Sequence, residues 1–259
     1  MPSKKKKFKI GIVLSGGAVR GFAHVGVLKA LNEYGIFPDV VSGASAGAIV
    51  GALYADGKTP DEILKIFEKK SIYKFLEFIV PNKGLVKMTG LHTALKQTIN
   101  AKTFEELKIP FYAAVTDLNN AQSIYFNSGE LVNMVIASST IPILFTPVII
   151  DGVFYVDGAI LNNLPIEPIE DLCEKIIGVN VNYIGHRDGF SGMMEMADRA
   201  IHLMIDQNME HKKKKFDLFI EPKELNKIGM MEMANHIKIF EIGYNETNKI
   251  LKEKMHLFQ

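Results

Sequence analysis

Short apolar runs alternate along this chain with longer segments whose apolar residues recur at helical spacing. Apolar runs with the length of buried strands lie at 9–14, 109–116, 176–181 and 218–220. Segments with a helical pattern lie at 21–34, 46–55, 130–139, 193–214 and 236–254. Strands that alternate with helices indicate a mainly parallel sheet covered on both faces. The pattern therefore predicts an α/β fold, a three-layer α/β/α sandwich around a mainly parallel central sheet.

Turn residues add detail to this outline. Thr59-Pro60-Asp61-Glu62 opens a further helix, because proline suits the first helical turn. Asp151-Gly152 lies between two apolar runs and predicts a β-hairpin over 148–156. A strand at 123–126 pairs with the strand at 109–116 or follows it.

No internal repeat, low-complexity segment or linker divides the sequence, so we expect a single domain over residues 1–259. Within it, the apolar segment 70–90 is expected to form a lid or a membrane-facing insertion. The chain is 47% apolar and 23% charged, with a net charge of +1. No apolar run approaches the ~20 residues that span a bilayer. The basic stretch Met1–Lys7 is followed by too short an apolar run for a signal peptide.

Cysteine and histidine usage excludes several classes of protein. The one cysteine, Cys173, allows no intramolecular disulfide and suits a reducing compartment, where we expect it to act as a small buried apolar residue. No cysteines or histidines stand at zinc-ligand spacing, so we expect no metal and no cofactor. We predict a cytoplasmic protein whose contact with membranes is peripheral.

The pentapeptide Gly43-Ala44-Ser45-Ala46-Gly47 stands between the short strand Val40-Val41 and the predicted helix 46–55. This is G-x-S-x-G at a strand-to-helix turn, the context of a nucleophile elbow. Only very small side chains fit on either side of the serine, because the two backbones nearly touch there. The helix N-terminus points at the serine and favours negative charge beside it. Ser45 is therefore a candidate nucleophile, and the alternative is a glycine-rich turn that packs a helix on a sheet.

A second glycine-rich turn, Ser15–Gly21, follows the first strand and opens a helix. Its backbone N–H groups can converge on an anion, either a phosphate or the oxyanion of an acyl-transfer intermediate. Asp39 stands near the second strand, about where a ribose-binding acid belongs in a dinucleotide fold. However, the glycine spacing does not match G-x-G-x-x-G, and no G-K-[ST] follows. With an elbow on the neighbouring strand, the oxyanion interpretation is favoured.

A nucleophilic serine needs a base, and the best candidate is Asp157. It follows an apolar β segment and precedes Gly158, where a carboxylate can be aimed rigidly into a cleft. An ordinary Asp-Gly turn is the alternative. Histidine is the usual partner of serine. Of the seven histidines, His186 is the one we regard as a candidate triad base, because it stands in a loop-like segment.

Together these motifs resemble the patatin-like phospholipase family. The resemblance rests on Ser15–Gly21, Gly43–Gly47 and Asp157-Gly158-Ala159, in that order. The proline-bearing block 137–148 and Asn162-Asn163-Leu164-Pro165 also resemble the family, and the match covers roughly residues 8 to 182. Ala18 stands where many relatives have glycine, and we expect it to be tolerated with a negative φ.

The resemblance implies a Ser-Asp dyad without a catalytic histidine. Ser45 would be the nucleophile, Asp157 the base, and the N–H groups of Gly16, Gly17 and Ala18 the oxyanion hole. The remaining motif residues that support this site are Arg20, Gly21, Gly43, Gly47 and Gly158. A carboxylate with a pKa near ~4 is a poor base unless desolvation raises it, so we expect a partly dry cleft. Arg20 would orient the loop, contact a lipid phosphate or simply stand at a helix start.

Apolar and basic segments outside the motifs bear on substrate and partners. Two methionine clusters, 193–196 and 230–233, suit either an acyl pocket or core packing. The lysine runs 4–7 and 212–215 are either solvated or bind anionic lipid surfaces. The expected partners are a phospholipid or lysophospholipid substrate and a peripheral membrane contact, with no nucleic acid; the sequence does not determine the oligomeric state.

The favoured function is a lipid acyl hydrolase: a phospholipase A, a lysophospholipase or a carboxylesterase. A nucleotide-binding protein that uses Ser15–Gly21 is one alternative. A catalytically silent interaction protein on the same scaffold is another. Acyl transfer to an acceptor other than water stays open as well, because it depends on access of water to the acyl-enzyme.

Overall fold

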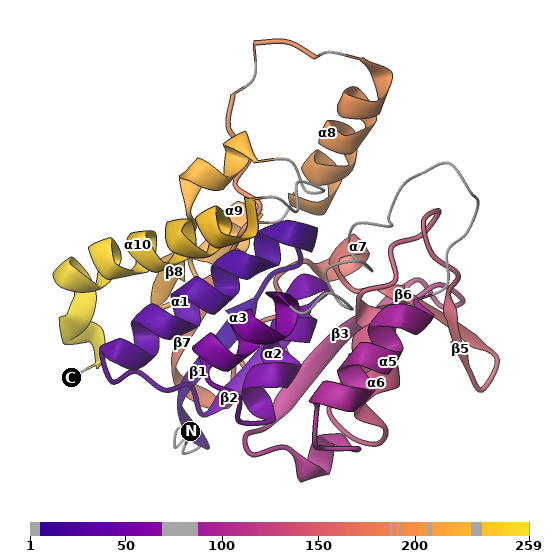
Figure 1. The fold of residues 1–259 in the computed structure, drawn as a ribbon, viewed down its shortest axis with the longest axis horizontal. Coiled ribbons are helices and arrows are strands. Elements are labelled where there is room, and N and C mark those ends of the chain that lie inside the picture. The colour runs from indigo at the N-terminus through magenta and orange to yellow at the C-terminus, as the bar shows by residue number, and fades with distance from the viewer. Residues whose placement is uncertain are drawn as a thin grey trace, which may run out of the picture.

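The fold is built on one β-sheet. Figure 1 shows the computed structural model of the chain. The structure describes residues 6–68, 88–186, 188–190, 192–206, 209–228 and 235–258. Within these residues, the sheet has eight strands: hydrogen-bonded pairing links seven of them in the path β5-β6-β3-β2-β1-β7-β8, and the eighth, β4, also pairs with β3. The strands are β1 Phe8–Leu14, β2 Val40–Ala44, β3 Phe111–Asp117, β4 Gln122–Phe126, β5 Val148–Ile150, β6 Val153–Asp157, β7 Cys173–Val179 and β8 Leu218–Ile220.

The sheet is parallel from β8 through β7, β1 and β2 to β3, and β4, β5 and β6 are antiparallel to their neighbours. The helices are η1 Ala18–Gly21, α1 Phe22–Glu33, α2 Ala46–Ala55, α3 Pro60–Glu68, α5 Thr89–Thr98, η2 Phe104–Glu106, α6 Leu131–Ser138, α7 Ala159–Asn162, α8 Met193–Asp206, α9 Met209–Lys213, η3 Lys223–Lys227, α10 His236–Lys254 and η5 Met255–Phe258. The predicted α/β fold with a mainly parallel sheet is confirmed.

Both faces of the sheet are covered, but unequally. Ile12 and Leu14 of β1 pack into the larger core, with α1, α2, α3, α5, α6 and α10. Val13, between them in sequence, points to the other face, as the two-residue period of a strand requires. There the covering layer is thin and comes from the segment 164–172, α9 and Phe216. In Figure 1, α10 lies alongside α1 over the larger core.

The end of β2 and the end of β6 meet on a single edge of β3. Ala44 of β2 pairs with Ala114, and Asp157 of β6 pairs with Val115, the next residue of β3. β4 occupies the other edge of β3, since it pairs with both of these positions. Because β2 and β6 run in opposite directions, the residue after Ala44 and the last residue of β6 come together. The hairpin predicted at Asp151-Gly152 forms, with φ values of 51° and 81° at these residues.

Two expected segments differ in the structure. The single helix predicted over 193–214 is described as two helices, α8 and α9, and residues 207 and 208 between them lie outside the described residues. The predicted lid or insertion at 70–90 lies outside them as well, except for its last three residues, where α5 begins at Thr89. Among the helices that the structure describes, none has both the length and the apolar character needed to cross a bilayer.

Candidate active site

Ser45 stands at the tip of a tight turn between β2 and α2. Its backbone has φ 53° and ψ −123°, a conformation that costs a non-glycine residue energy. The flanking glycines allow the backbones on either side of the turn to approach each other closely. A Cβ on Gly43 would lie 2.5 Å from the carbonyl oxygen of Gly47, and one on Gly47 would lie 2.3 Å from that of Leu14. The predicted strand–turn–helix context of a nucleophile elbow is therefore present.

The side chains of Ser45 and Asp157 are in direct contact. The Ser45 hydroxyl donates a hydrogen bond of 2.6 Å to Oδ2 of Asp157. The other carboxylate oxygen, Oδ1, accepts the N–H of Ala159 at 2.9 Å. Both side chains are buried, with 6% and 4% of each residue exposed. Burial raises the pKa of Asp157 from 3.8 to about 6, against the lowering effect of its two hydrogen bonds.

Ser138, at the end of α6, holds the two halves of this pair together. Its Oγ accepts the backbone N–H of Ser45 at 3.0 Å and donates to the carbonyl oxygen of Ala114 at 2.6 Å. Its own carbonyl oxygen accepts the N–H of Gly158 at 3.4 Å. A Cβ on Gly158 would lie 2.2 Å from the oxygen of Ala114, so only glycine fits after Asp157. Sequence reasoning singled out the block 137–148 but assigned Ser138 no role.

The three backbone N–H groups expected to form an oxyanion hole differ in their hydrogen bonding. The N–H of Gly16 donates to Oδ1 of Asn163 at 2.9 Å, with the backbone oxygen of Asn163 as a longer second acceptor at 3.4 Å, and is therefore already engaged. The N–H groups of Gly17 and Ala18 donate to no partner within the described part of the chain. The expectation of a negative φ at Ala18 is wrong, because the residue has φ 47°. The turn into η1 requires this left-handed conformation, which alanine adopts at a cost.

Arg20 and Gly21 bind this loop to its surroundings. Arg20 is 7% exposed, and its guanidinium donates to the carbonyl oxygen of Ile228 from Nε at 3.0 Å and from Nη2 at 2.8 Å. These bonds favour the loop-orienting role of Arg20 over contact with a lipid phosphate. A Cβ on Gly21 would lie 2.7 Å from Cβ of Ala46, so the start of α1 packs directly against the elbow.

No histidine of the described residues hydrogen-bonds to Ser45 or Asp157. His186, the candidate triad base, is exposed, and its Nε2 lies 3.2 Å from Oδ1 of Asp188. His24 is fully buried in α1 and donates from Nε2 to the carbonyl oxygen of Ser15 at 2.8 Å. Burial lowers the pKa of His24 to about 4, so its ring is neutral at pH 7.

Asp39 does not stand where a ribose-binding acid would. It precedes β2, and its Oδ2 accepts the N–H groups of Lys9 and Ile10 at 3.0 and 2.9 Å. It therefore joins the amino ends of two strands, whereas the glycine-rich loop lies at their carboxyl ends. Nucleotides bind at the carboxyl ends of such sheets, so this geometry gives the dinucleotide alternative no support.

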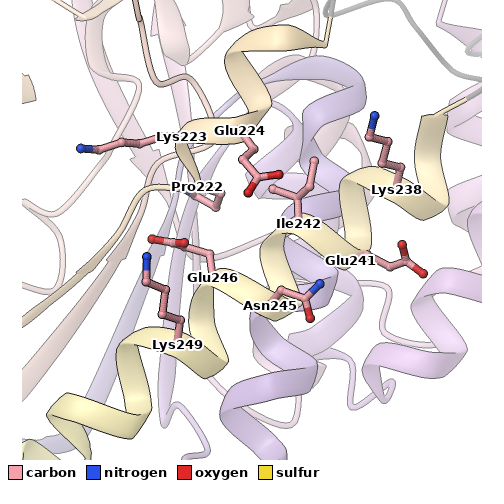
Figure 2. Close-up of a pocket in the computed structure, with 9 residues that line it drawn as sticks. All are labelled: Pro222, Lys223, Glu224, Lys238, Glu241, Ile242, Asn245, Glu246 and Lys249. Carbon is pink, nitrogen blue, oxygen red and sulfur yellow. The ribbon is translucent and has the colours of Figure 1, made fainter.

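Other polar features lie away from Ser45. A cavity of about 360 Å³ lies between η3 and α10, and none of its lining residues belongs to the predicted site. Figure 2 shows these lining side chains, most of which are lysine and glutamate. Cys173 is buried, and burial raises its pKa to about 12, which suits a small packing residue. Among the described residues, no group of three or more histidine, cysteine, aspartate or glutamate side chains is placed to hold a metal ion.

Comparison with known proteins identifies the family. The sequence model described as Patatin-like phospholipase matches residues 12–169, which include every motif residue named above. The chain belongs to the patatin-like phospholipase family. The matched region begins in β1 and ends after α7, so it spans both the elbow and Asp157.

Curated relatives of this patatin-like chain are longer proteins. A lysophospholipase nte1 of Emericella nidulans is 27% identical over 94% of the chain, and an uncharacterized NTE family protein of Mycobacterium bovis is 32% identical over 67% of it. The chain spans 18% of the length of the first relative and 49% of the second.

Solved structures share the fold of this patatin-like chain. VipD from Legionella pneumophila has a TM-score of 0.56 and 14% sequence identity, over 96% of this chain and 67% of that one. The type III effector protein ExoU has a TM-score of 0.52 and 13% identity, over 96% of this chain and 53% of that one. At these identities the likeness is one of fold.

The positive φ of Ala18 leads to a stability prediction. Ala18→Gly removes the Cβ that disfavours φ 47°, and we expect it to raise the free energy of unfolding by about 1 kcal/mol. Urea denaturation followed by circular dichroism measures the change. As a control, Ala30→Gly in the interior of α1 should lower stability by about 1 kcal/mol or more. Equal destabilisation by both substitutions would contradict a strained Ala18.

Proposed function

We propose that this patatin-like chain is a lipid acyl hydrolase that cleaves fatty-acyl esters of phospholipids or lysophospholipids, or acts as a carboxylesterase. The observation that carries the proposal is the 2.6 Å hydrogen bond from the Ser45 hydroxyl to a buried carboxylate. Membership of a family described as phospholipases supports the same reaction class, and a lysophospholipase is among the similar curated proteins.

In the proposed reaction, Asp157 takes the proton of Ser45 as the serine oxygen attacks the ester carbonyl carbon. The carbonyl oxygen becomes negative, and the unengaged N–H groups of Gly17 and Ala18 stabilise it. The intermediate collapses to an acyl-enzyme while Asp157 returns the proton to the leaving alcohol. Asp157 then takes a proton from water as the water oxygen attacks the acyl carbon. It passes this proton to the Ser45 oxygen as the fatty acid leaves, which restores the starting pair.

Burial makes Asp157 competent for this role. An ordinary aspartate is a weak base, whereas a group with a pKa near the working pH is a far better one. The dry surroundings of Asp157 move its pKa to about 6. The N-terminus of α2, which begins at Ala46, adds positive potential beside the reacting oxygen atoms.

We further propose that the molecule contacts membranes through an apolar rim near the site, which we define as Ile160 and Leu161 of α7 with Met193, Met196, Leu203 and Met204 of α8. Ile160 and Leu161 are 39% and 49% exposed, and α7 begins two residues after Asp157. The four α8 residues stand at helical spacing on one stripe and are 47% to 82% exposed. α8 packs against α7 and projects from the body of the fold beyond it (Figure 1).

The exposure of Met193 and Met196 favours this rim over the predicted acyl pocket; the second methionine cluster, 230–233, lies outside the described residues.

In the lysine run 212–215, three of the four positive charges are paired with glutamates, which leaves less charge for binding anionic lipid than the sequence indicates. Lys212 pairs with Glu167, Lys213 with Glu210 and Glu221, and Lys215 with Glu170. The proposed contact therefore depends on apolar burial more than on anionic lipid.

The dyad is tested first by covalent labelling. We expect a fluorophosphonate probe to add once to the wild type, seen as a single intact-mass shift, and not to Ser45→Ala. Asp157→Asn should lower kcat on a short-chain p-nitrophenyl ester by about 10²- to 10⁴-fold, the usual contribution of a general base. Ser128→Ala, at an exposed loop serine, serves as the control and should label like the wild type. A wild type that neither labels nor turns over would refute the hydrolase proposal.

The pH profile tests the base separately. Asp157 must be deprotonated to act, so kcat/KM on the soluble ester should rise about tenfold per pH unit below the pKa of about 6 and level off above it. The residual activity of Asp157→Asn should lack this rise. If that variant retains the same profile, the base is another group, and His186→Asn becomes the next variant to measure.

The apolar rim is tested by cosedimentation with phosphatidylcholine vesicles. Leu203→Glu and Met204→Glu should each weaken vesicle binding about tenfold, because burying one such side chain contributes about 1.5 kcal/mol or more. Their activity on the soluble ester should stay within twofold. Phe37→Glu is the control, since Phe37 is 58% exposed but precedes β2 at the far end of the sheet from Ser45. Equal weakening by Phe37→Glu, or none by the α8 variants, would contradict the rim.

A further inference from the structure

Both backbone polar groups of Gly16 are bonded to buried asparagine side chains. The N–H of Gly16 donates to Oδ1 of Asn163 at 2.9 Å, and its carbonyl oxygen accepts Nδ2 of Asn182 at 2.6 Å. The Ser15 hydroxyl donates to the same carbonyl oxygen at 2.9 Å. The N–H of Gly16 is therefore committed within the protein, whereas those of Gly17 and Ala18 are not.

Each of the two asparagines bonds to Gly16 through one side-chain polar atom, while its other side-chain polar atom has no partner among the described residues. Asn163 and Asn182 are 4% and 5% exposed. Nδ2 of Asn163 and Oδ1 of Asn182 are buried and have no hydrogen-bond partner. A buried amide that leaves one polar atom unpaired is costly, and such groups in folded proteins call for a reason. Holding Gly16 is the one contact that both side chains share.

The asparagines approach Gly16 from two different parts of the fold. Asn163 directly follows α7, the helix that begins two residues after Asp157. Asn182 follows β7, which pairs with β1 just before the loop. The loop is thereby joined to the segment that carries the proposed base as well as to the sheet.

Gly16 itself lies against the nucleophile. A Cβ on Gly16 would lie 2.9 Å from Oδ1 of Asn163, 3.0 Å from Cβ of Ser45 and 3.1 Å from Cβ of Ala159. A small rotation of the Gly16 peptide therefore changes the position of the next two N–H groups relative to the Ser45 hydroxyl. Oxyanion donors are effective only when they are held in place before the reaction.

We propose that Asn163 and Asn182 are positioning residues that hold the Gly16 peptide from both sides, so that the N–H groups of Gly17 and Ala18, and not that of Gly16, receive the oxyanion. This inference rests on the proposed hydrolase function. It replaces the three-donor hole expected from the sequence with a two-donor hole and a fixed support. Neither asparagine touches the reacting atoms in this scheme.

The test compares Asn163→Ala and Asn182→Ala with Asn162→Ala. Asn162 is the matched control: it precedes Asn163, is 6% exposed, and bonds through Nδ2 to Tyr125 and Glu167 instead of Gly16. On a soluble p-nitrophenyl ester, both test variants should lower kcat by about 10- to 100-fold, because a misplacement of about 1 Å can cost about 100-fold and the donors themselves are retained. KM should stay within twofold, and Asn162→Ala should change neither constant beyond twofold.

A pair of inhibitors separates positioning from a general loss of structure. An alkyl trifluoromethyl ketone takes up the Ser45 oxygen at its carbonyl carbon, the serine proton passes to Asp157, and the former carbonyl oxygen becomes an oxyanion. The corresponding alcohol binds the same site and forms no oxyanion. In the test variants, Ki for the ketone should rise by the factor by which kcat/KM falls, and Ki for the alcohol should stay constant.

Each result decides the inference. Wild-type kcat in folded Asn163→Ala and Asn182→Ala would overturn it, as would equal losses in Asn162→Ala or parallel changes in both inhibitor constants. If an alanine variant does not fold, Asn182→Asp keeps the shape of the side chain but loses the donor to Gly16, and it should show the same ketone-specific loss. A wild type that fails to label with fluorophosphonate refutes the hydrolase proposal itself, whereas a labelled wild type with unaffected variants refutes only the role of the asparagines.

Discussion

The arrangement of the site depends on one edge of β3. β2 and β6 pair with that edge from opposite directions and end at neighbouring positions, Ala114 and Val115. The turn after β2 presents Ser45, and the end of β6 presents Asp157, so backbone hydrogen bonding brings the two side chains together. Ser138 reinforces this meeting point, because its hydroxyl bonds to the backbone of both Ser45 and Ala114. Strand pairing alone thus brings a serine and a carboxylate from distant parts of the chain into contact.

Burial gives this meeting point its chemistry. A carboxylate in water has too low a pKa to accept the proton of a serine efficiently, and desolvation raises the pKa of Asp157 to about 6. The same burial makes every neighbouring polar group need a partner. The loop before α1 meets part of this requirement with side chains from three directions: His24 bonds to Ser15, and Asn163 and Asn182 bond to Gly16. Dryness and rigidity therefore arise from the same packing.

Much of the fold and part of the candidate site could be predicted from sequence, for identifiable reasons. β1, α2, α3, β8 and α10 follow from local apolar periodicity and turn residues, and the Asp151-Gly152 hairpin follows from its turn. The elbow glycines could be recognised in the sequence because the backbones approach so closely there that no residue with a Cβ fits. By contrast, the negative φ expected at Ala18 was wrong, because the turn into η1 requires a left-handed residue there. The bond between Gly16 and Asn163 was missed, because it depends on how the loop meets the end of α7.

The sequence by itself determined the order of strands and helices, the motif serine and aspartate, and the family, because these depend on residue types and spacings along the chain. Only the tertiary structure decided that Ser45 and Asp157 touch, that no described histidine joins them, and which N–H groups of the loop stay unengaged. It also decided that Met193, Met196 and Met204 of α8 are exposed. These outcomes depend on contacts between residues far apart in sequence, on strand register and on burial, and local patterns carry no information about the partner a side chain meets.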